Sequence, residues 1–174
     1  MAQDYPDIVI RQAGAGDALR LSLVANATFL ETFAGMIDGN ALVAHCEKAH
    51  APAYLESLLK AGGRAWLAEL DGAPIGYALL LEPELDAAQE GDIELKKIYL
   101  MSRFHGSGIA AQMLEAAVEA AQGCKRLLLG VKEDNARAIA FYEREGFRQI
   151  GTRRFDVGGK QYDDVVLARA LGEG

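Results

Sequence analysis

The chain contains 174 residues, of which 51% are hydrophobic and 25% charged, proportions typical of one globular domain. Its formal net charge of −7 argues against nucleic-acid binding, which usually needs a basic surface. No apolar run approaches the roughly 20 residues of a membrane span, and the first residues lack the basic-then-apolar pattern of a secretion signal. We therefore expect a cytoplasmic protein that does not bind membranes, in which Cys46 and Cys124 are free thiols.

The first half of the chain predicts a strand, two helices and a β-hairpin. The expected segments are a strand at residues 8–12, a helix from Asp17 to about Phe33, a helix over roughly 41–60, and strands at 64–70 and 73–81. Asp17 is placed to cap the first helix, because its carboxylate can accept a hydrogen bond from an unpaired N–H of the first turn. The two strands flank Asp71-Gly72, a dipeptide typical of a tight hairpin turn.

The second half is organised around residues 92–122, where a strand, a glycine turn and a helix follow one another. Apolar residues dominate the strand up to Leu100, and Ile109, Met113 and Ala117 then recur at helical spacing. The segments expected after these are an apolar strand at 126–131, a helix from Asp134 or Asn135 to Gly146, and strands at 147–155 and 162–170. This order predicts a single α/β domain over residues 1–174 with a mixed sheet.

The turn 105–111 (HGSGIAA) is the first candidate site. Gly106 and Gly108 stand where a helix begins, so the unpaired N–H groups and the positive end of its dipole can meet a phosphate. No Gly-Lys-Ser/Thr follows, which excludes a usual P-loop. Gly106, Gly108 and Ala111 meet the pattern G-x-G-x-x-G/A, but the acidic residue that a dinucleotide site needs about 20 positions later is missing. The simpler interpretation is a turn that only starts a helix.

Asn135, Ala138 and Tyr142 form the second candidate site. Asn135 and Tyr142 are seven residues apart, which places them on one helical face at a separation of about 10 Å. Ala138 lies between them and is small, so this face suits an elongated ligand. Alternatively, Tyr142 is a core residue whose hydroxyl lies at the rim.

Residues 94–111 and 135–147 together resemble the GNAT superfamily of N-acetyltransferases, which transfer acetyl from acetyl-CoA to an amine. The resemblance covers the element order of almost the whole chain. It implies a mixed, mostly antiparallel sheet of about seven strands flanked by four helices. The family motif Q/R-x-x-G-x-G/A falls on residues 105–110, with His105 where Gln or Arg is usual, and Arg103 is a candidate to compensate for that difference.

This resemblance assigns the following residues to acetyl-CoA: Ile98, Tyr99, Leu100, His105, Gly106, Ser107, Gly108, Ile109, Ala110, Ala111, Asn135 and Tyr142. In the family, the strand before the glycine turn carries a bulge and pairs with the pantetheine arm. The sequence is compatible with a bulge, because the apolar residues change parity between Leu95 and Ile98. Tyr142 corresponds to the tyrosine thought to protonate the departing CoA thiolate.

Two glutamates are candidates on the acceptor side. A protonated amine cannot attack a thioester, and Glu94, on the central strand, is the first candidate for the base that removes the proton. Glu94 could equally be a solvated strand carboxylate that faces Lys96 or Lys97. Glu31 is a weaker candidate for binding the substrate, and the alternative is an exposed helical glutamate.

The acceptor is expected to be a primary amine of a small molecule. The TFLETF, ELKKIYL and GVKEDNARAIAFYEREGF segments resemble the polyamine (spermidine/spermine) branch of the family, although Lys132 replaces a frequent aromatic residue. Acidic residues near the expected acceptor site could pair with a polycation or be solvated: Glu31, Asp38, Asp156, Asp163 and Asp164. An amino acid, another small amine and a protein N-terminus are competing acceptors.

Two other classes of protein remain open. A catalytically silent acyl-CoA-binding module would use the same glycine turn, and a dinucleotide oxidoreductase would use it for NAD(P). No metal site is expected, because His45, His50 and His105 do not form a ligand set. The sequence does not give the oligomeric state, and a homodimer is suggested only by analogy with the family, in which dimers are common.

Overall fold

Seven strands form one mixed sheet in the computed structural model, which describes residue 5 and residues 7–172. The strands are β1 (Ile8–Ala13), β2 (Arg64–Leu70), β3 (Ala73–Leu81), β4 (Asp92–Leu100), β5 (Arg126–Lys132), β6 (Arg148–Val157) and β7 (Lys160–Ala170). They lie in the order β1-β2-β3-β4-β5-β7-β6, and every pair is antiparallel except β4 and β5. This sheet is the one predicted, while the predicted domain bounds at residues 1 and 174 lie outside the described residues.

The described residues form five α-helices, one more than predicted. They are α1 (Ala18–Phe33), α2 (Gly39–Ala49), α3 (Pro52–Lys60), α4 (Ile109–Ala120) and α5 (Ala136–Arg144), with short 3-10 helices η1 (Ala15–Asp17) and η2 (Ser102–Phe104). The prediction of one helix over residues 41–60 was wrong because Pro52 divides it. Proline lacks an N–H and forces extended backbone on the residue before it, so α2 ends and a new helix starts at Pro52.

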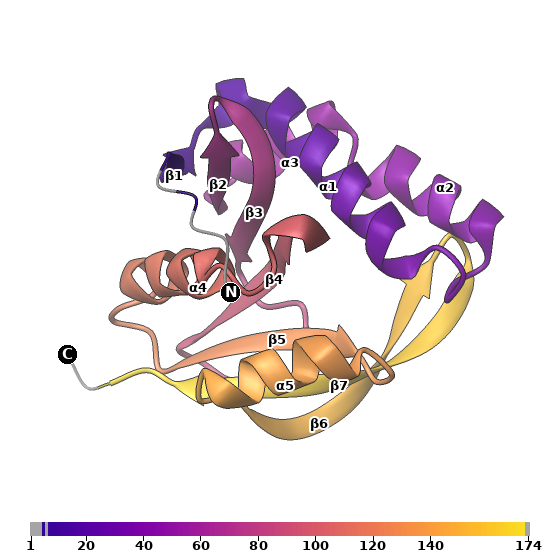
Figure 1. The fold of residues 1–174 in the computed structure, drawn as a ribbon. Coiled ribbons are helices and arrows are strands. Elements are labelled where there is room, and N and C mark those ends of the chain that lie inside the picture. The colour runs from indigo at the N-terminus through magenta and orange to yellow at the C-terminus, as the bar shows by residue number, and fades with distance from the viewer. Residues whose placement is uncertain (1–4, 6, 173–174) are drawn as a thin grey trace.

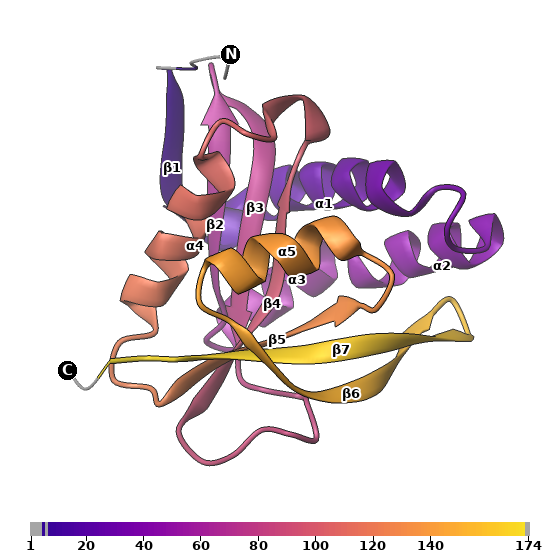
Figure 2. The same cartoon turned by 60° about the horizontal axis from the view of Figure 1, so that its bottom comes forward.

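The helices cover both faces of the sheet (Figures 1 and 2). Met113 of α4 and Tyr142 of α5 belong to a core cluster on one face, and Leu21 of α1 belongs to a second cluster on the other. Side chains of β2 alternate between the two, since Trp66 joins the first cluster and Leu67 the second. The sheet is therefore buried on both faces where the helices lie.

Strands β4 and β5 are hydrogen-bonded at one end and separate at the other. Only residues 92–94 of β4 pair with residues 126–128 of β5. Beyond Glu94 the two strands diverge, β4 to Leu100 and β5 to Lys132, as Figure 2 shows. The edge of β4 that faces β5 therefore has no strand partner over its second half, and a wedge opens inside the sheet.

A β-bulge at Lys96 reorients β4 at the mouth of this wedge. Leu95 and Lys97 lie opposite consecutive residues of β3, so Lys96 between them is an extra residue. The same core cluster receives the apolar residues on both sides of the bulge, Ile93, Leu95, Ile98 and Leu100. The change of parity in the sequence thus predicted the bulge correctly.

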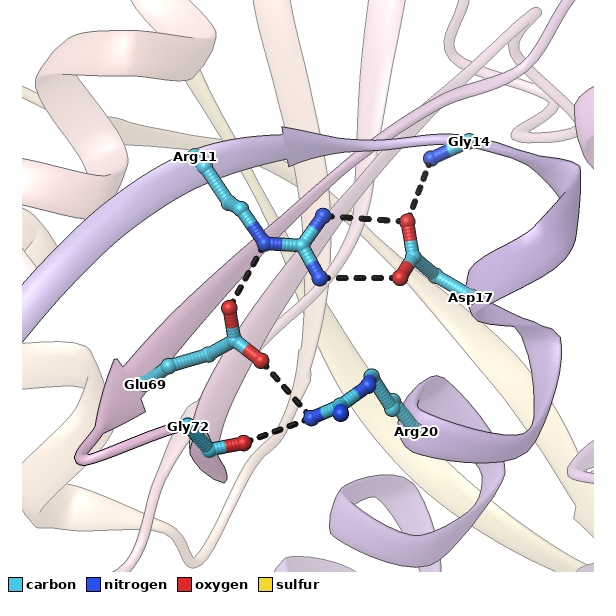
Figure 3. Close-up of polar contacts among 6 residues, drawn as sticks. All are labelled: Arg11, Gly14, Asp17, Arg20, Glu69 and Gly72. Atoms are coloured by element: carbon cyan, nitrogen blue, oxygen red, sulfur yellow. Dashed lines mark hydrogen bonds and ion pairs between the residues drawn. The ribbon is translucent and has the colours of Figure 1, made fainter.

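Asp17 stands before α1, as predicted, but its side chain makes no capping hydrogen bond. Figure 3 shows that its carboxylate instead receives two hydrogen bonds from Arg11, at 3.0 and 2.8 Å, and one from the amide of Gly14 at 2.9 Å. Arg11 also donates to Glu69 at 2.6 Å, and Arg20 donates to the same carboxylate at 2.9 Å. The Asp17 carboxylate therefore serves the ion pair with Arg11 and the cap of η1 instead of the cap of α1, and the network ties β1, α1 and β2 together.

Candidate active site

A cavity of about 580 Å³ occupies the wedge between β4 and β5. Its wall comes from α1, β4, the glycine turn, β5, α5 and the two last strands. The predicted site residues that line it are Glu31, Ile98, Tyr99, Leu100, His105, Gly106, Gly108, Ala110, Ala111, Asn135 and Tyr142. Ser107, Ile109 and Glu94 are described but do not line it. The fold thus brings together residues that are more than 100 positions apart in the sequence.

The glycine turn contributes free backbone N–H groups to this cavity. Gly106 and Gly108 have φ angles of 83° and 85°, in the left-handed region that favours glycine. Within the described chain, the amides of Gly108, Ala110 and Ala111 donate no hydrogen bond. No atom lies within 4 Å of the position that a Cβ on either glycine would take. Open space, unpaired amides and the start of α4 together fit a phosphate group.

His105 is held between the end of β4 and α5. Its Nε2–H donates to the carbonyl of Leu100 at 2.7 Å, and Arg137 donates to its Nδ1. Burial lowers the pKa of His105, so a neutral ring can fill both roles. The arginine that lines this part of the cavity is Arg137, which sequence reasoning missed. Arg103 instead stacks on Phe104, with its guanidinium carbon 4.6 Å from the ring centroid.

One face of α5 lines the cavity through Asn135, Ala138 and Tyr142, as their spacing predicted. Tyr142 is 8% exposed and packs on Phe147, yet no described residue accepts a hydrogen bond from its hydroxyl. Burial raises the pKa of Tyr142, so the phenol keeps its proton and can donate it. Asn135 accepts from the amide of Ala138 at 3.4 Å and caps α5, which leaves its NH₂ group for a ligand.

The two candidate glutamates lie in different surroundings. Glu94 is 1% exposed and its carboxylate accepts from the amide of Glu84 at 3.2 Å and pairs with Lys96 at 3.5 Å. It therefore faces Lys96, as the alternative interpretation had it, but the expectation of a solvated carboxylate was wrong because Glu94 is buried. Its role as a base stays a prediction. Glu31 lines the cavity and accepts from the amide of Ser102 at 2.7 Å, so one of its two oxygens is engaged.

The part of the cavity lined by α1, β6 and β7 is aromatic and basic. Its aromatic residues are Phe29, Phe33, Tyr99, Phe155 and Tyr162. Its cations include Lys97, Lys132 and Arg153, of which sequence reasoning named Lys132 and, as a residue that Glu94 could face, Lys97. Lys132 pairs with Asp134 at 2.6 Å, and Arg153 pairs with Asp164 at 3.1 Å. All three cations also contact aromatic rings, but among the described residues no carboxylate forms an ion pair with Lys97.

Few of the predicted acidic residues reach this cavity. Of the five that could pair with a polycation, Glu31 and Asp164 line it. Asp38 caps α2 through the amide of Ala41 and pairs with Lys160 at 3.5 Å. Asp156 accepts from an amide in the β6–β7 turn at 3.1 Å. The acidic sequence around the acceptor side is thus largely used for local structure.

Three further observations concern the chain outside the cavity. Cys46 and Cys124 are free thiols, as predicted. No helix in the described part of the chain is long and apolar enough to cross a membrane. Among the same residues, no group of three or more His, Cys, Asp or Glu side chains could hold a metal ion.

Comparison with solved structures shows that the fold is shared. The PaiA N-acetyltransferase from Thermoplasma acidophilum, solved in complex with coenzyme A, superposes with a TM-score of 0.77 at 19% identity, over 94% of this chain and 98% of that one. YncA from Salmonella typhimurium, a putative acetyltransferase solved with acetyl-CoA, superposes with a TM-score of 0.69 at 19% identity, over 96% of this chain and 95% of its own. At these identities the likeness concerns the fold.

Relatives by sequence are also acetyltransferases by name. An uncharacterized N-acetyltransferase from Mycobacterium tuberculosis strain H37Rv is 38% identical over 103 residues, which cover 58% of this chain and 63% of the relative. The spermine/spermidine N(1)-acetyltransferase from Bacillus subtilis strain 168 is 32% identical over 91 residues, 49% of this chain and 60% of that protein. The chain thus matches a little under two thirds of the length of these relatives.

The sequence pattern of the acetyltransferase (GNAT) family matches residues 31–147. This span contains β4, the glycine turn, the start of α5 and the cavity-lining Tyr142. The chain therefore belongs to the GNAT family, as the resemblance of its two motifs indicated.

Proposed function

We propose that this protein is an acetyl-CoA-dependent N-acetyltransferase that moves acetyl to a primary amine of a small molecule. The observation that carries this proposal is the meeting of an unpaired strand edge and a glycine-initiated helix in one cavity. The edge of β4 beyond Glu94 offers backbone donors and acceptors, and the turn before α4 offers free amides. A ligand that binds to both the strand edge and the free amides of the turn needs amide groups for the first and a phosphate group for the second.

The glycine turn and β4 divide the binding of acetyl-CoA between them. Amides from Gly106 to Ala111 receive the pyrophosphate at the start of α4, where the helix dipole favours negative charge. The backbone of Ile98, Tyr99 and Leu100 pairs with the amides of the pantetheine arm, as an added strand would. Arg137 supplies the charge that the family motif places at position 105.

The reaction forms one C–N bond and breaks one C–S bond. The free amine attacks the thioester carbonyl, the bond to sulfur breaks, and the products are an acetamide and CoA thiol. The amine loses two protons in all, one before attack and one after it, and the sulfur gains one. Tyr142 donates a hydrogen bond to the departing sulfur, because its hydroxyl is protonated and free in the cavity.

The base that deprotonates the amine is either Glu94 or a chain of water molecules. Glu94 lies behind the cavity wall, and Lys96, its partner, lines the cavity. A proton would therefore have to pass through water or past Lys96 to reach that carboxylate. Glu31 is proposed to contact the acceptor with its remaining carboxylate oxygen.

A polyamine is one proposed acceptor, suggested by the name of the Bacillus subtilis relative, a spermine/spermidine N(1)-acetyltransferase. An amino acid and a protein N-terminus are the others. A cytoplasmic location, a single domain over the whole chain and a homodimer are further proposals that rest on the sequence.

Calorimetric titration with acetyl-CoA, followed by release of free thiol with a panel of amines, tests the proposal. We expect binding of acetyl-CoA in preference to NAD(P) and amine-dependent thiol release. Binding without turnover of any amine or peptide would favour the silent acyl-CoA-binding module. Preference for NAD(P) would contradict the proposal altogether.

A further inference from the structure

Lys97 follows the bulge in β4 and places its amine in an aromatic box inside the cavity. Its Nζ lies 5.5 Å from the ring centroid of Phe29, 5.3 Å from that of Phe155 and 6.0 Å from that of Tyr99. These rings come from α1, β6 and β4, so three separate elements converge on this one charge. Cation–π contact stabilises an ammonium group partly, but it supplies no opposite charge.

Lys97 has no anionic partner within the described chain. No hydrogen bond or ion pair joins its Nζ to residues 5 or 7–172, although it is a lining residue of the cavity. The nearby carboxylates are engaged elsewhere, since Asp164 pairs with Arg153 and Glu94 pairs with Lys96. Burial lowers the pKa of Lys97 to about 8, so the amine is still mostly charged near neutral pH. A half-buried charge without a partner favours an anionic ligand.

The groups behind Lys97 do not neutralise it. His45 and His50 line a smaller cavity of about 70 Å³ that shares Lys96, Lys97 and Phe155 with the large one. Burial lowers the pKa of His45 to about 4 and that of His50 to about 3, so both rings are neutral. Neither histidine therefore adds charge beside Lys97, and Glu84, the carboxylate that lines the smaller cavity, pairs with Lys96 at 3.1 Å.

A polycation fits these surroundings poorly. Of the acidic groups that line the acceptor side, Asp164 pairs with Arg153, and Glu31 has one oxygen bound to the amide of Ser102, which leaves only its second oxygen for an ammonium group. A second ammonium group on the acceptor would meet Lys97 at close range, where repulsion is strong because little water screens it. An acceptor with an apolar body and a negative group instead meets rings and a free cation.

We propose that the acceptor carries a carboxylate that Lys97 binds and an apolar or aromatic body that packs on Phe29 and Phe155, as in an α-amino acid, and is not a polyamine. This inference rests on the proposed function. Lys97 directly precedes Ile98–Leu100, the segment proposed to hold the pantetheine arm. A carboxylate bound there keeps the amine, only two bonds away from the carboxyl carbon, near the thioester.

Matched pairs of amines that differ only in the carboxylate give the direct test. The pairs are phenylalanine and phenylethylamine, tyrosine and tyramine, tryptophan and tryptamine, and leucine and isoamylamine, with spermidine added. We expect the wild-type protein to prefer the acid of at least one pair by about 10- to 100-fold in kcat/KM, the range of a buried charge-assisted contact.

Variants at Lys97 separate its charge from its shape. Lys97→Met keeps a long side chain among the rings and should reduce the preference to within about threefold, while Lys97→Arg should retain most of it. Lys48→Met, an exposed lysine of α2 outside the cavity, is the control and should leave the preference unchanged. Calorimetry with acetyl-CoA should give the same Kd for all of these proteins.

Several results would overturn the inference while leaving the proposed function intact. One is that the protein turns over spermidine or the decarboxylated amines faster than the acids. Another is that it prefers the acids but that Lys97→Met does not change this preference. If no amine of the panel is turned over, the N-acetylated form of each amine is titrated into the CoA-loaded protein instead. Equal binding of the acid and the decarboxylated member of every pair would then overturn the inference. Failure of the proposed function is recognised separately, by absence of acetyl-CoA binding.

Discussion

Gly158, in the turn between β6 and β7, lies against the backbone of Ala41 in the first turn of α2. A Cβ added to Gly158 would stand 2.4 Å from the carbonyl oxygen of Ala41 and 2.5 Å from its Cα. Two contacts reinforce this one, because Lys160 pairs with Asp38 at 3.5 Å and the hydroxyl of Tyr162 accepts from the amide of Asp38 at 3.3 Å. The hairpin and α2 thus lock together at the aromatic part of the cavity.

Replacing Gly158 by Ala should push the hairpin away from α2. Backbone atoms cannot yield as a flexible side chain does, so we expect the walls of the acceptor side to move. The predicted result is a fall of about tenfold in kcat/KM for the acceptor, with the Kd of acetyl-CoA unchanged. Steady-state kinetics and calorimetry on the same protein measure the two effects.

Gly159→Ala is the matched control for this variant. Gly159 also has a positive φ, 91°, but no atom lies within 4 Å of its added Cβ. It should therefore show only the backbone strain of about 1 kcal/mol that a left-handed alanine costs. Equal kinetic effects of the two substitutions would show that strain in the turn, and not the contact with Ala41, is responsible.

Replacing Tyr142 by Phe should slow turnover by about 100-fold or more, because the departing sulfur loses its hydrogen-bond donor. The ring and its packing on Phe147 are retained, so acetyl-CoA should bind within about threefold of the wild-type Kd. Tyr77→Phe, which removes another buried hydroxyl outside the large cavity, is the control and should change turnover by less than about threefold. An unchanged rate in Tyr142→Phe would exclude the proposed donor.

The sequence was sufficient for the strands, for the bulge in β4 and for the position of the glycine turn at the start of α4. The parity change between Leu95 and Ile98 marked the bulge, and the positions of Gly106 and Gly108 marked the start of α4, because both features depend on neighbouring residues. The predicted number of helices was wrong because the apolar pattern continues through Pro52, a residue that ends helices. Local patterns therefore predict local geometry, and a single residue with special backbone chemistry can override them.

Contacts between distant side chains could not be predicted in the same way. From the sequence, Lys97 was considered only as a residue that Glu94 could face, and it is the packing of α1 and β6 around β4 that surrounds it with Phe29 and Phe155. The sequence did not single out Arg137 for the same reason, since its role depends on how α5 lies beside His105. Asp17 had the position of a helix cap, but Arg11, which Glu69 of β2 also holds, binds its carboxylate instead.

Arg137 should contribute to acetyl-CoA binding more than Arg103 does. Arg137→Gln removes a cation that lines the cavity near the glycine turn, and we expect a rise of about tenfold in the Kd of acetyl-CoA. The salt dependence of that Kd should also weaken, because one charged contact is lost. Arg103→Gln should stay within about twofold of wild type in the same calorimetric titrations. Equal losses in the two variants would contradict the assignment of Arg137.

The network around Asp17 predicts a pH-dependent term in stability (Figure 3). Hydrogen bonds from Arg11 and from the amide of Gly14 lower the pKa of Asp17 from 3.8 to about 2 in the folded protein. The unfolded chain therefore binds this proton more readily, so the stabilisation is complete above about pH 4 and is lost as the pH falls towards 2. Because Asp17 and Arg11 are partly exposed, we expect about 1–2 kcal/mol from this group.

Asp17→Asn tests this term directly. Its free energy of unfolding in urea should fall below that of wild type by about 1–2 kcal/mol at pH 7, and the difference should shrink as the pH approaches 2. Asp71→Asn is the control, because Asp71 lies in an exposed turn at φ 51°, a conformation that asparagine tolerates. That variant should match wild type at every pH. A difference for Asp17→Asn that stayed constant down to pH 2 would show that the loss comes from altered packing or hydrogen bonding and not from the charge of Asp17.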